Sequence, residues 1–528
     1  METWSQRKMN RRHFLQAAAA VSATTTILPI LDACGSTTTT NSIGTKTKPL
    51  VIANIEGVPT LDPDLIIADT AVSLQTEIFD TLVDYDETSK QVVPRMATSW
   101  KVVNDTTIEF KLRSGMKFTN GEACDANAVK FTVDRTLNPA TKSLRSTVLQ
   151  NVVSVDVVDP LTARFNLKQP DPLLIQYMIT YAILPPNFTT QNSALLATAP
   201  VGSGPYKVSA FQSGYQVVLV RNDGYWGPKP AFQYAVYRTL ASSESQLASL
   251  LAGDIHIASN LDPVQAKTLG GNSKFRVVSK PKLLQAVITL DQIGRTDPKG
   301  PMTDQRVRQA VNQAVNFDAI INDILLGHGT RLAAGVCPFQ FGFDPTVEPW
   351  PYDPATAKQL LSAAGYPNGF EARIISQNGG GIVDQPQTAQ AIQSDLAAVG
   401  ITMSILNMTD PSAVGALVMS GKAGPMIQLG NAAGGVYDAG ADYSFIFQCG
   451  NPFSYYCNSQ FGSLNKQQAS TLDQTARQAT LSQMQKFIHD DAGALFEWSV
   501  HGICGVSSAV NWPSYSGRQE KLYTARPA

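Results

Sequence analysis

The chain has 528 residues, of which 43% are hydrophobic and 16% are charged, and its formal net charge at pH 7 is -1. This length is more than one hydrophobic core usually holds, so we expect two or three domains. The near-neutral charge argues against a nucleic-acid ligand and against a polybasic membrane-binding patch.

The amino terminus has the pattern of a removable export signal. Arg11 and Arg12 precede an Ala-rich apolar run over residues 17–31, which several polar residues and Pro29 interrupt too often for a permanent membrane span. Paired arginines before such a run indicate twin-arginine export. A plain amphipathic start is the alternative.

The run ends in Leu31-Asp32-Ala33-Cys34, which is similar to a lipobox. We therefore predict a signal peptide with lipobox over residues 1–34 and lipid attachment at Cys34. Asp32 departs from the small or apolar residue usual at its position, and ordinary cleavage nearby, giving a free protein, is the alternative. Residues 35–49 are rich in Thr, Ser and Lys, which is typical of a flexible tether.

Five further cysteines follow Cys34. Outside the cytoplasm, Cys449 and Cys457 are close enough in sequence to close a small loop by a disulfide. Cys124, Cys337 and Cys504 then remain. Three cysteines cannot all pair, so we expect at least one buried free thiol.

Past the tether, strands and helices are intermixed. Alternating apolar residues predict strands over residues 108–112 and 215–219, and Asp159-Pro160 predicts a hairpin between residues 155–158 and 164–167. Helices are predicted over residues 303–326, 353–365 and 389–399, with glycines near their ends. Apolar stretches at residues 372–375 and 401–406 follow helices, so the second half is predicted to be α/β.

The motifs of common catalytic sites are missing from the sequence. There is no Gly-x-Ser-x-Gly, no His-Glu-x-x-His and no phosphate-binding loop ending in Gly-Lys-Ser/Thr, and the five histidines are not at metal-ligand spacing. Gly202-Ser203-Gly204 precedes Pro205, which favours a turn over a phosphate site. Asp438 and Asp442 are more typical of solvated loop acids than of an acid/base pair. We expect no catalytic residue, metal or cofactor.

Short motifs from Leu50 onward resemble one protein family. They are Leu61-Asp62-Pro63, residues 77–83, 94–100 and 110–118, Asn120-Gly121-Glu122, residues 128–131, 200–206 and 306–311, Asp318-Ala319-Ile320, Tyr352-Asp353-Pro354 and residues 363–367. In this order and spacing they resemble the ABC-transporter extracellular solute-binding proteins of family 5, the dipeptide, oligopeptide and nickel type.

This resemblance implies a two-lobed α/β fold of the periplasmic-binding-protein type II, with an extra subdomain in lobe one and a hinge that the chain crosses twice. It places lobe one in residues 50–72, 195–282 and 498–528, the extra subdomain in residues 73–194, and lobe two in residues 283–497. Two lobes can close on a ligand. A transporter that binds only the closed form therefore distinguishes the ligand-bound receptor from the empty one by its conformation.

The resemblance also implies where a ligand is held: by the loop after the first strand, by aromatic side chains and by a lobe-two loop that carries Trp and Asp in peptide binders. The corresponding candidates are Glu56, Tyr181, Asn431, Tyr437, Asp438, Asp442 and Trp498. Asn431 stands near the place of the family Trp, and the acid is Asp438, Asp442 or neither. A carboxylate at Glu56 suits a ligand ammonium, with an exposed loop acid as the alternative.

Two further readings accompany these candidates. Core packing is the alternative for Tyr181 and Trp498. The pair Cys449 and Cys457 resembles a disulfide loop of peptide-binding relatives, which would brace the cleft wall.

The resemblance implies an exported, membrane-anchored receptor at the periplasmic or cell surface, which takes a di- or oligopeptide and delivers it to an ABC permease. The expected partners are this ligand, the permease subunits and the membrane through a lipid anchor; the chain is expected to be a monomer with no nucleic-acid partner. A receptor for an opine, an oligosaccharide or a metal chelate is the alternative within the fold. A surface sensor or a secreted enzyme is the third hypothesis.

Overall fold

The computed structural model describes residues 43–377, 382, 385–431, 435–513 and 519–528. The predicted export signal, Cys34 and most of the predicted tether lie in residues 1–42, outside the described residues. Within the described part of the chain, no helix combines the length and the apolar character that a membrane span needs.

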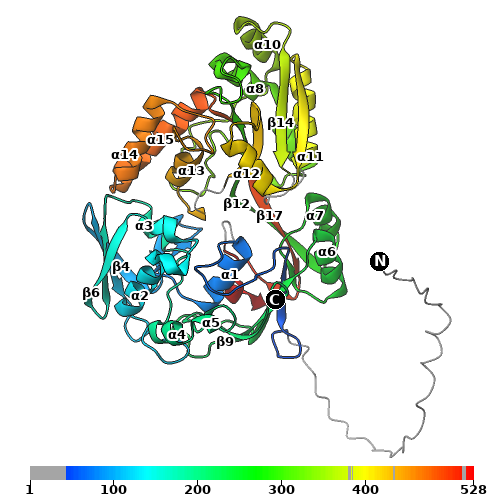
Figure 1. The fold of residues 1–528 in the computed structure, drawn as a ribbon. Helices are drawn as coiled ribbons and strands as arrows, with labels where there is room; N and C mark the ends of the chain where they lie inside the picture. The colour runs from blue at the N-terminus through cyan, green and yellow to red at the C-terminus, as the bar shows by residue number, and fades with distance from the viewer. Residues whose placement is uncertain (1–42, 378–381, 383–384, 432–434, 514–518) are drawn as a thin grey trace, which may run out of the picture. The chain divides into compact units, whose positions relative to one another are not determined.

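One large sheet connects the two lobes (Figure 1). Its strands lie in the order β15-β14-β16-β12-β17-β11-β1-β10-β9-β8, and β13 also pairs with β17. The strands are β1 (Leu50–Asn54), β8 (Tyr206–Gln212), β9 (Gln216–Arg221), β10 (Tyr234–Thr239), β11 (Ile257–Ala258), β12 (Phe275–Leu290), β13 (Gly329–Arg331), β14 (Phe370–Gln377), β15 (Ile401–Met408), β16 (Met426–Asn431) and β17 (Ala494–Ser507).

Lobe one packs its apolar side chains around β1. Leu50 and Ile52 face one hydrophobic cluster and Val51 and Ala53 face another, because successive strand residues point to opposite sides of the sheet. The helices of this lobe are α1 (Asp69–Ile78), α6 (Ser243–Ala252) and α7 (Pro263–Gly270), and its last strands are β18 (Val510–Asn511) and β19 (Arg526–Pro527). Position 202 requires glycine, because a β-carbon added there would lie 2.0 Å from the Ile78 carbonyl oxygen. The segment Gly202-Ser203-Gly204 is therefore a turn packed closely against α1.

The extra subdomain has its own sheet and core. Its sheet order is β4-β5-β7-β6, covered by α2 (Ala126–Leu137), whose Asp125 side chain accepts from the amides of residues 127 and 128. The strands and helices are β2 (Val83–Asp86), β3 (Gln91–Pro94), β4 (Ala97–Asn104), β5 (Thr107–Leu112), β6 (Val152–Asp159), β7 (Thr162–Leu167), α3 (Leu174–Tyr177), α4 (Pro186–Gln191) and α5 (Ser193–Leu196). The predicted strand over residues 108–112 and the hairpin at Asp159-Pro160 are confirmed.

Lobe two is built from β12, β14, β15, β16 and most of the later helices. These are α8 (Gln305–Ala314), α9 (Phe317–Ala319), α10 (Pro354–Ala363), α11 (Gln385–Ala397), α12 (Pro411–Met419), α13 (Ala439–Ile446), α14 (Ser459–Ser470) and α15 (Gln474–Asp490). The predicted helices at residues 353–365 and 389–399 are confirmed in α10 and α11. Gly365 and Gly400 follow them with φ of 93° and 94°, the left-handed conformation that favours glycine.

The prediction of one helix over residues 303–326 is wrong. The segment begins as a 3-10 turn and continues as α8, but Val315 is extended and Asn316 starts a new helix by accepting a hydrogen bond from the Ala319 amide. The chain then passes through α9 into a π-helical turn, η4 (Ile320–Ile324). A local cap at Asn316 therefore outweighs the apolar periodicity across the break.

Two long strands carry the chain between the lobes. In β12, Val277 and Val278 pack with the lobe-one clusters while Ile288 and Leu290 pack with a lobe-two cluster. In the antiparallel partner β17 the order is reversed, from Leu495 in lobe two to Val506 in lobe one. We keep the sequence-based limits of the lobes as the proposed division.

Glu497 on β17 is fully buried in lobe two. The Gln428 side chain donates to its Oε1 at 2.9 Å. Burial raises the pKa of Glu497 to about 8, although Gln428 and the nearby Arg331 oppose the shift. A carboxyl with a raised folded-state pKa binds its proton more tightly when folded, so its contribution to stability is present at low pH and is lost as the pH rises from about 4.5 to 8.

Glu497→Gln should therefore leave the free energy of unfolding nearly unchanged at pH 5 and raise it at pH 8, by on the order of 3 kcal/mol. Urea denaturation at both pH values measures the difference, with the exposed Glu348→Gln as the matched control. An equal effect of Glu497→Gln at both pH values would contradict the protonated state.

Candidate functional site

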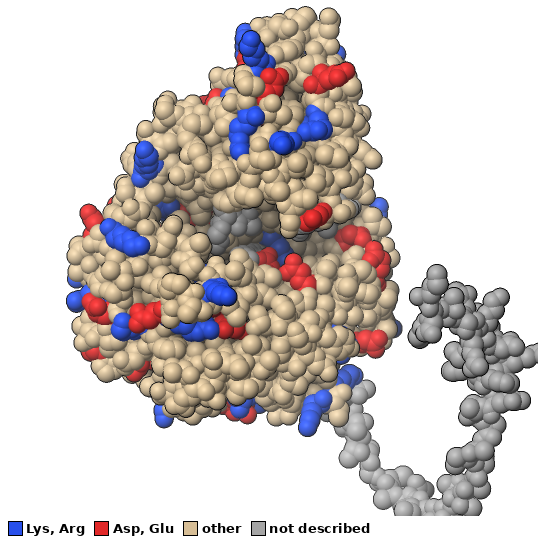
Figure 2. All heavy atoms as spheres, viewed as in Figure 1, with Lys and Arg blue, Asp and Glu red and all other residues tan. Residues whose placement is uncertain are grey.

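A cavity of about 440 Å³ lies where the two lobes face each other along β12 and β17. Figure 2 shows the hollow between the lobes, with acidic side chains gathered along its lower margin. Its apolar side includes Leu284, Ile382 and Val500, which pack with the hydrophobic cluster of lobe two. The lobe-one wall contains the apolar residues Ile55, Leu261 and Ile503. Its polar and charged residues are more numerous: Asn54, Glu56, Asp69, Thr70, Ser73, Ser243, Ser259, Asn260, Asp262, Lys282, His501 and Glu520.

Carboxylates outnumber cations on the described lobe-one wall. Glu56 and Asp69 are exposed there, whereas Asp262 caps α7 by accepting from the Gln265 amide. Lys282 Nζ lies 3.6 Å from Glu520 Oε1, and this carboxylate holds the pKa of Lys282 above its ordinary value against the opposing effect of burial. The described wall therefore favours a cationic group on a ligand.

Asp442 and Asn431 lie in a buried polar cluster of lobe two. Both bind Gln285: Asn431 Nδ2 donates to Gln285 Oε1 at 2.7 Å, and Gln285 Nε2 donates to Asp442 Oδ2 at 2.9 Å. Gln340 Nε2 donates to the same Asp442 oxygen at 2.7 Å. Asn431 and Asp442 are only 2% and 3% exposed, so this cluster stabilises the lobe and offers little surface to a solute.

Asp438 is neutralised inside lobe two by Arg477. The two side chains form a bidentate ion pair with distances of 2.6 and 2.7 Å, and Asp438 also caps α13 by accepting from the Gly440 amide. Asp438 is 1% exposed. Neither lobe-two acid named from the sequence therefore presents its carboxylate to the cavity.

Tyr437 packs against lobe one and belongs to its subdomain's hydrophobic cluster. Its ring stacks on Tyr85 with the centroids 3.7 Å apart, and the Tyr85 hydroxyl donates to the Phe339 carbonyl at 2.7 Å. Both tyrosines are 5% exposed. This stack joins the hairpin β2–β3 to the lobe-two loop next to residues 432–434, which lie outside the described residues.

Tyr181 and Trp498 lie in hydrophobic cores. The Tyr181 hydroxyl is 2.6 Å from Thr136 Oγ1 and 3.1 Å from the Thr132 carbonyl oxygen, so its polar end is satisfied within the subdomain. Trp498 packs edge-on against Phe317 in lobe two. With exposed fractions of 2% and 1%, these side chains fit the packing alternative given above.

Comparison with known proteins decides the family. The model of bacterial extracellular solute-binding proteins, family 5, matches residues 91–454. The chain is also 30% identical over 369 residues to the glutathione-binding protein GsiB of Shigella boydii serotype 4, covering 68% of this chain and 70% of that protein. This chain is a family 5 solute-binding protein.

Solved structures show the same two-lobed fold. The periplasmic binding protein DppA from Helicobacter pylori, in complex with peptide STSA, has a TM-score of 0.72 and 24% identity over 90% of this chain and 98% of that one. NikA from Brucella suis, in complex with Fe(III)-EDTA, has a TM-score of 0.77 and 24% identity over 91% and 99% of the two chains. The fold expected from the motifs is confirmed for this family 5 protein.

Of the candidate residues named from the sequence, Glu56 is the one that the structure places on the cavity wall. Sequence reasoning missed Asp69, Lys282, His501 and Glu520, which come from distant parts of the chain. For Lys282 and His501, a detectable signal was a polar side chain close to each point where the chain was expected to cross between lobes; Asp69 and Glu520 lie away from these points. Pairing of β12 with β17 brings these points together.

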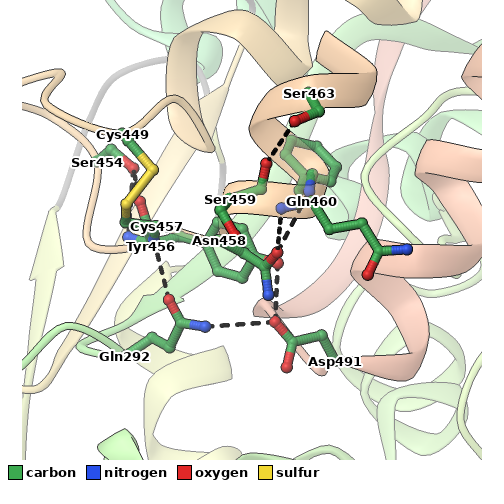
Figure 3. Close-up of a disulfide and its surroundings, with 11 residues drawn as sticks. Gln292, Cys449, Ser454, Tyr456, Cys457, Asn458, Ser459, Gln460, Ser463 and Asp491 are labelled. Atoms are coloured by element: carbon green, nitrogen blue, oxygen red, sulfur yellow. Dashed lines mark hydrogen bonds between the residues drawn. A yellow bond between two sulfur atoms is a disulfide. The ribbon is translucent and has the colours of Figure 1, made fainter.

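Cys449 and Cys457 form a disulfide beside α13 (Figure 3). The Cys457 amide donates to Gln292 Oε1, and Gln292 Nε2 donates to Asp491 Oδ2, which also accepts from the Tyr456 hydroxyl. Asp491 is further paired with Arg308 of α8 at 2.8 Å. The disulfide loop is thus fixed to lobe two. Cys124, Cys337 and Cys504 are all buried free thiols, as the count of cysteines led us to expect for at least one.

Removing the disulfide with Cys449→Ser and Cys457→Ser should lower the free energy of unfolding by about 2.5 kcal/mol, because the unfolded chain regains the entropy of a short open loop. Urea denaturation in oxidising buffer measures this change. Under reducing conditions the wild type and the double variant should unfold alike, and a persistent difference would assign the effect to the serines.

Proposed function

We propose that this family 5 protein is the extracytoplasmic receptor of an ABC importer, that it binds a di- or oligopeptide or a peptide-like solute between its lobes, and that it delivers this solute to the permease. The observation that carries the proposal is the 440 Å³ cavity, with an acidic wall from lobe one and an apolar wall from lobe two. Its volume suits a small solute. The glutathione-binding relatives point to the same chemical class.

The ligand's ammonium is assigned to Glu56 and Asp69. They are the exposed carboxylates of the described wall, while Asp438 and Asp442 are engaged within lobe two. A charge-assisted hydrogen bond to an ammonium gains strength when the lobes exclude water. The apolar side chains of Leu284 and Ile382 then face the less polar part of the solute.

A metal chelate is a second candidate because NikA from Brucella suis was solved with Fe(III)-EDTA. An anionic chelate would meet the carboxylates of the described lobe-one wall at short range, which is unfavourable. The wall therefore favours a cationic or zwitterionic solute over an anionic one.

Ligand identity is tested by releasing bound small molecules from the purified protein, identifying them by mass spectrometry, and titrating candidates while the melting temperature is followed. Peptides with a free amino terminus should raise it, because a ligand that binds the folded state stabilises that state. If peptides leave it unmoved while a sugar or a chelate raises it, peptide binding is wrong.

The assigned carboxylates are tested with a matched peptide pair. N-acetylation, Glu56→Gln or Asp69→Asn should each weaken binding at least about tenfold, the cost of losing one charge-assisted hydrogen bond. Asp134→Asn on α2, away from the cavity, should leave the affinity unchanged. Tight binding of both peptides by all variants would refute the assignment and leave the receptor function standing.

The proposed membrane anchor is Cys34, in the signal peptide with lipobox. In cells given labelled fatty acid, the wild type should carry label and sediment with membranes. Cys34→Ser should lose the label and appear in the soluble extracytoplasmic fraction, because a single cysteine carries the diacylglycerol. A labelled Cys34→Ser protein would overturn the assignment.

A further inference from the structure

A chain of hydrogen bonds crosses between the lobes where β12 and β17 meet. The Ser279 hydroxyl lies 2.8 Å from His328 Nδ1 and 3.0 Å from His501 Nδ1. His501 Nε2 lies 2.8 Å from Thr330 Oγ1. Ser279 is on β12, His501 is on β17, Thr330 is on β13, and His328 directly precedes β13.

This series of hydrogen bonds links side chains of lobe one to side chains of lobe two, which separate when the lobes move. The β12 segment around Ser279 packs on lobe one through Val277, whereas β13 follows η4 in lobe two. Beside it lies a groove of about 390 Å³, with Lys267 and Val277 on its lobe-one side and Asn322 and His328 on its lobe-two side. A change in the angle between the lobes must change the distance across this groove, and with it the bond between Ser279 and His328.

This series of hydrogen bonds can accept one additional proton on its two histidine rings but not two. With both imidazoles neutral, the Ser279 hydroxyl donates to one ring and accepts from the other. If His501 takes a proton, it donates to Ser279 and Thr330 while Ser279 donates to His328, so every bond is kept. If both rings are protonated, both must donate to the Ser279 oxygen, and two cations meet across one hydroxyl.

We propose that His328, Ser279, His501 and Thr330 form a latch that holds the lobes in the orientation seen here and opens when both histidines are protonated. The proposal is independent of ligand identity, since no bond of the latch requires a solute. The latch would couple solvent acidity to the hinge of the receptor.

Charged side chains surround the two histidines of the latch, His328 and His501. The charged neighbours of the latch along its strands are Lys280 and Lys282 on β12 and Arg331 on β13. The two cavities beside it carry Lys267 on α7 and the carboxylates of Glu56, Asp69, Asp262 and Glu520. Lys280 is paired with Glu87 and Lys282 with Glu520. The cavity that His501 lines holds more carboxylates than cations, whereas the groove that His328 lines holds Lys267.

Burial makes the latch neutral at pH 7. Burial, with a smaller contribution from His328, lowers the pKa of His501 to about 4, and burial also lowers the pKa of His328. The latched state therefore takes up protons less readily than the open state, and by linkage its population falls as the pH falls toward 4.

Hydrogen exchange on the full chain, without added ligand, tests the latch. Ser279→Ala keeps both rings and removes the bridge, so at pH 7 the amides of residues 275–285 and 498–503 should exchange about tenfold faster than in the wild type, the value of one hydrogen bond. The wild type should show the same acceleration at pH 4 after correction for intrinsic exchange. Ser154→Ala in the subdomain also removes one hydroxyl contact and should change neither segment.

His328→Gln separates protonation from structure. Its amide can still bond to Ser279 but cannot take a proton, so both segments should stay protected at pH 4. His256, whose pKa burial also lowers to about 4, remains in every variant, and its titration cannot account for a difference between them. Unchanged exchange in Ser279→Ala at pH 7, or acid opening of His328→Gln equal to that of the wild type, would overturn the latch. If Ser279→Ala does not fold, the exchange of His328→Gln at pH 4 alone tests the latch.

Discussion

The antiparallel pairing of β12 with β17 is the constraint on which the other features depend. These strands of 16 and 14 residues pair from Phe275 with Ser507 to Thr289 with Ala494, so both halves of the fold share one backbone ladder. The ladder shifts register between Pro281 and Gln285. A register shift interrupts the regular ladder, and such irregularities bend and twist the strands that carry them. The cavity and the latch residues both lie beside it.

Charge placement follows from this arrangement. Two buried aspartates of lobe two have partners inside the lobe: Arg477 pairs with Asp438, and the side-chain amides of Gln285 and Gln340 donate to Asp442. An unpaired carboxylate buried in a lobe would be costly. The interlobe cavity remains open to water, so it tolerates the exposed carboxylates of Glu56 and Asp69.

Local patterns predicted several elements of the fold but, among the cavity residues, only Glu56. The hairpin at Asp159-Pro160 and the helix capped by Asp353 depend on neighbours in sequence, and both formed as expected. The break at Val315 was missed because one capping side chain, Asn316, decides it. Lys282 and Glu520 meet across more than two hundred residues, and no local pattern encodes that contact.

Tyr437 has a packing role that the sequence did not indicate. An aromatic residue in the lobe-two loop suggested a ligand contact, but Tyr437 is stacked on Tyr85 and buried. The stack, the Tyr85 bond to Phe339 and the Lys90 bond to the Pro338 carbonyl tie the hairpin β2–β3 to lobe two near the hinge. These contacts connect lobe two to the subdomain at a place separate from the β12–β17 ladder.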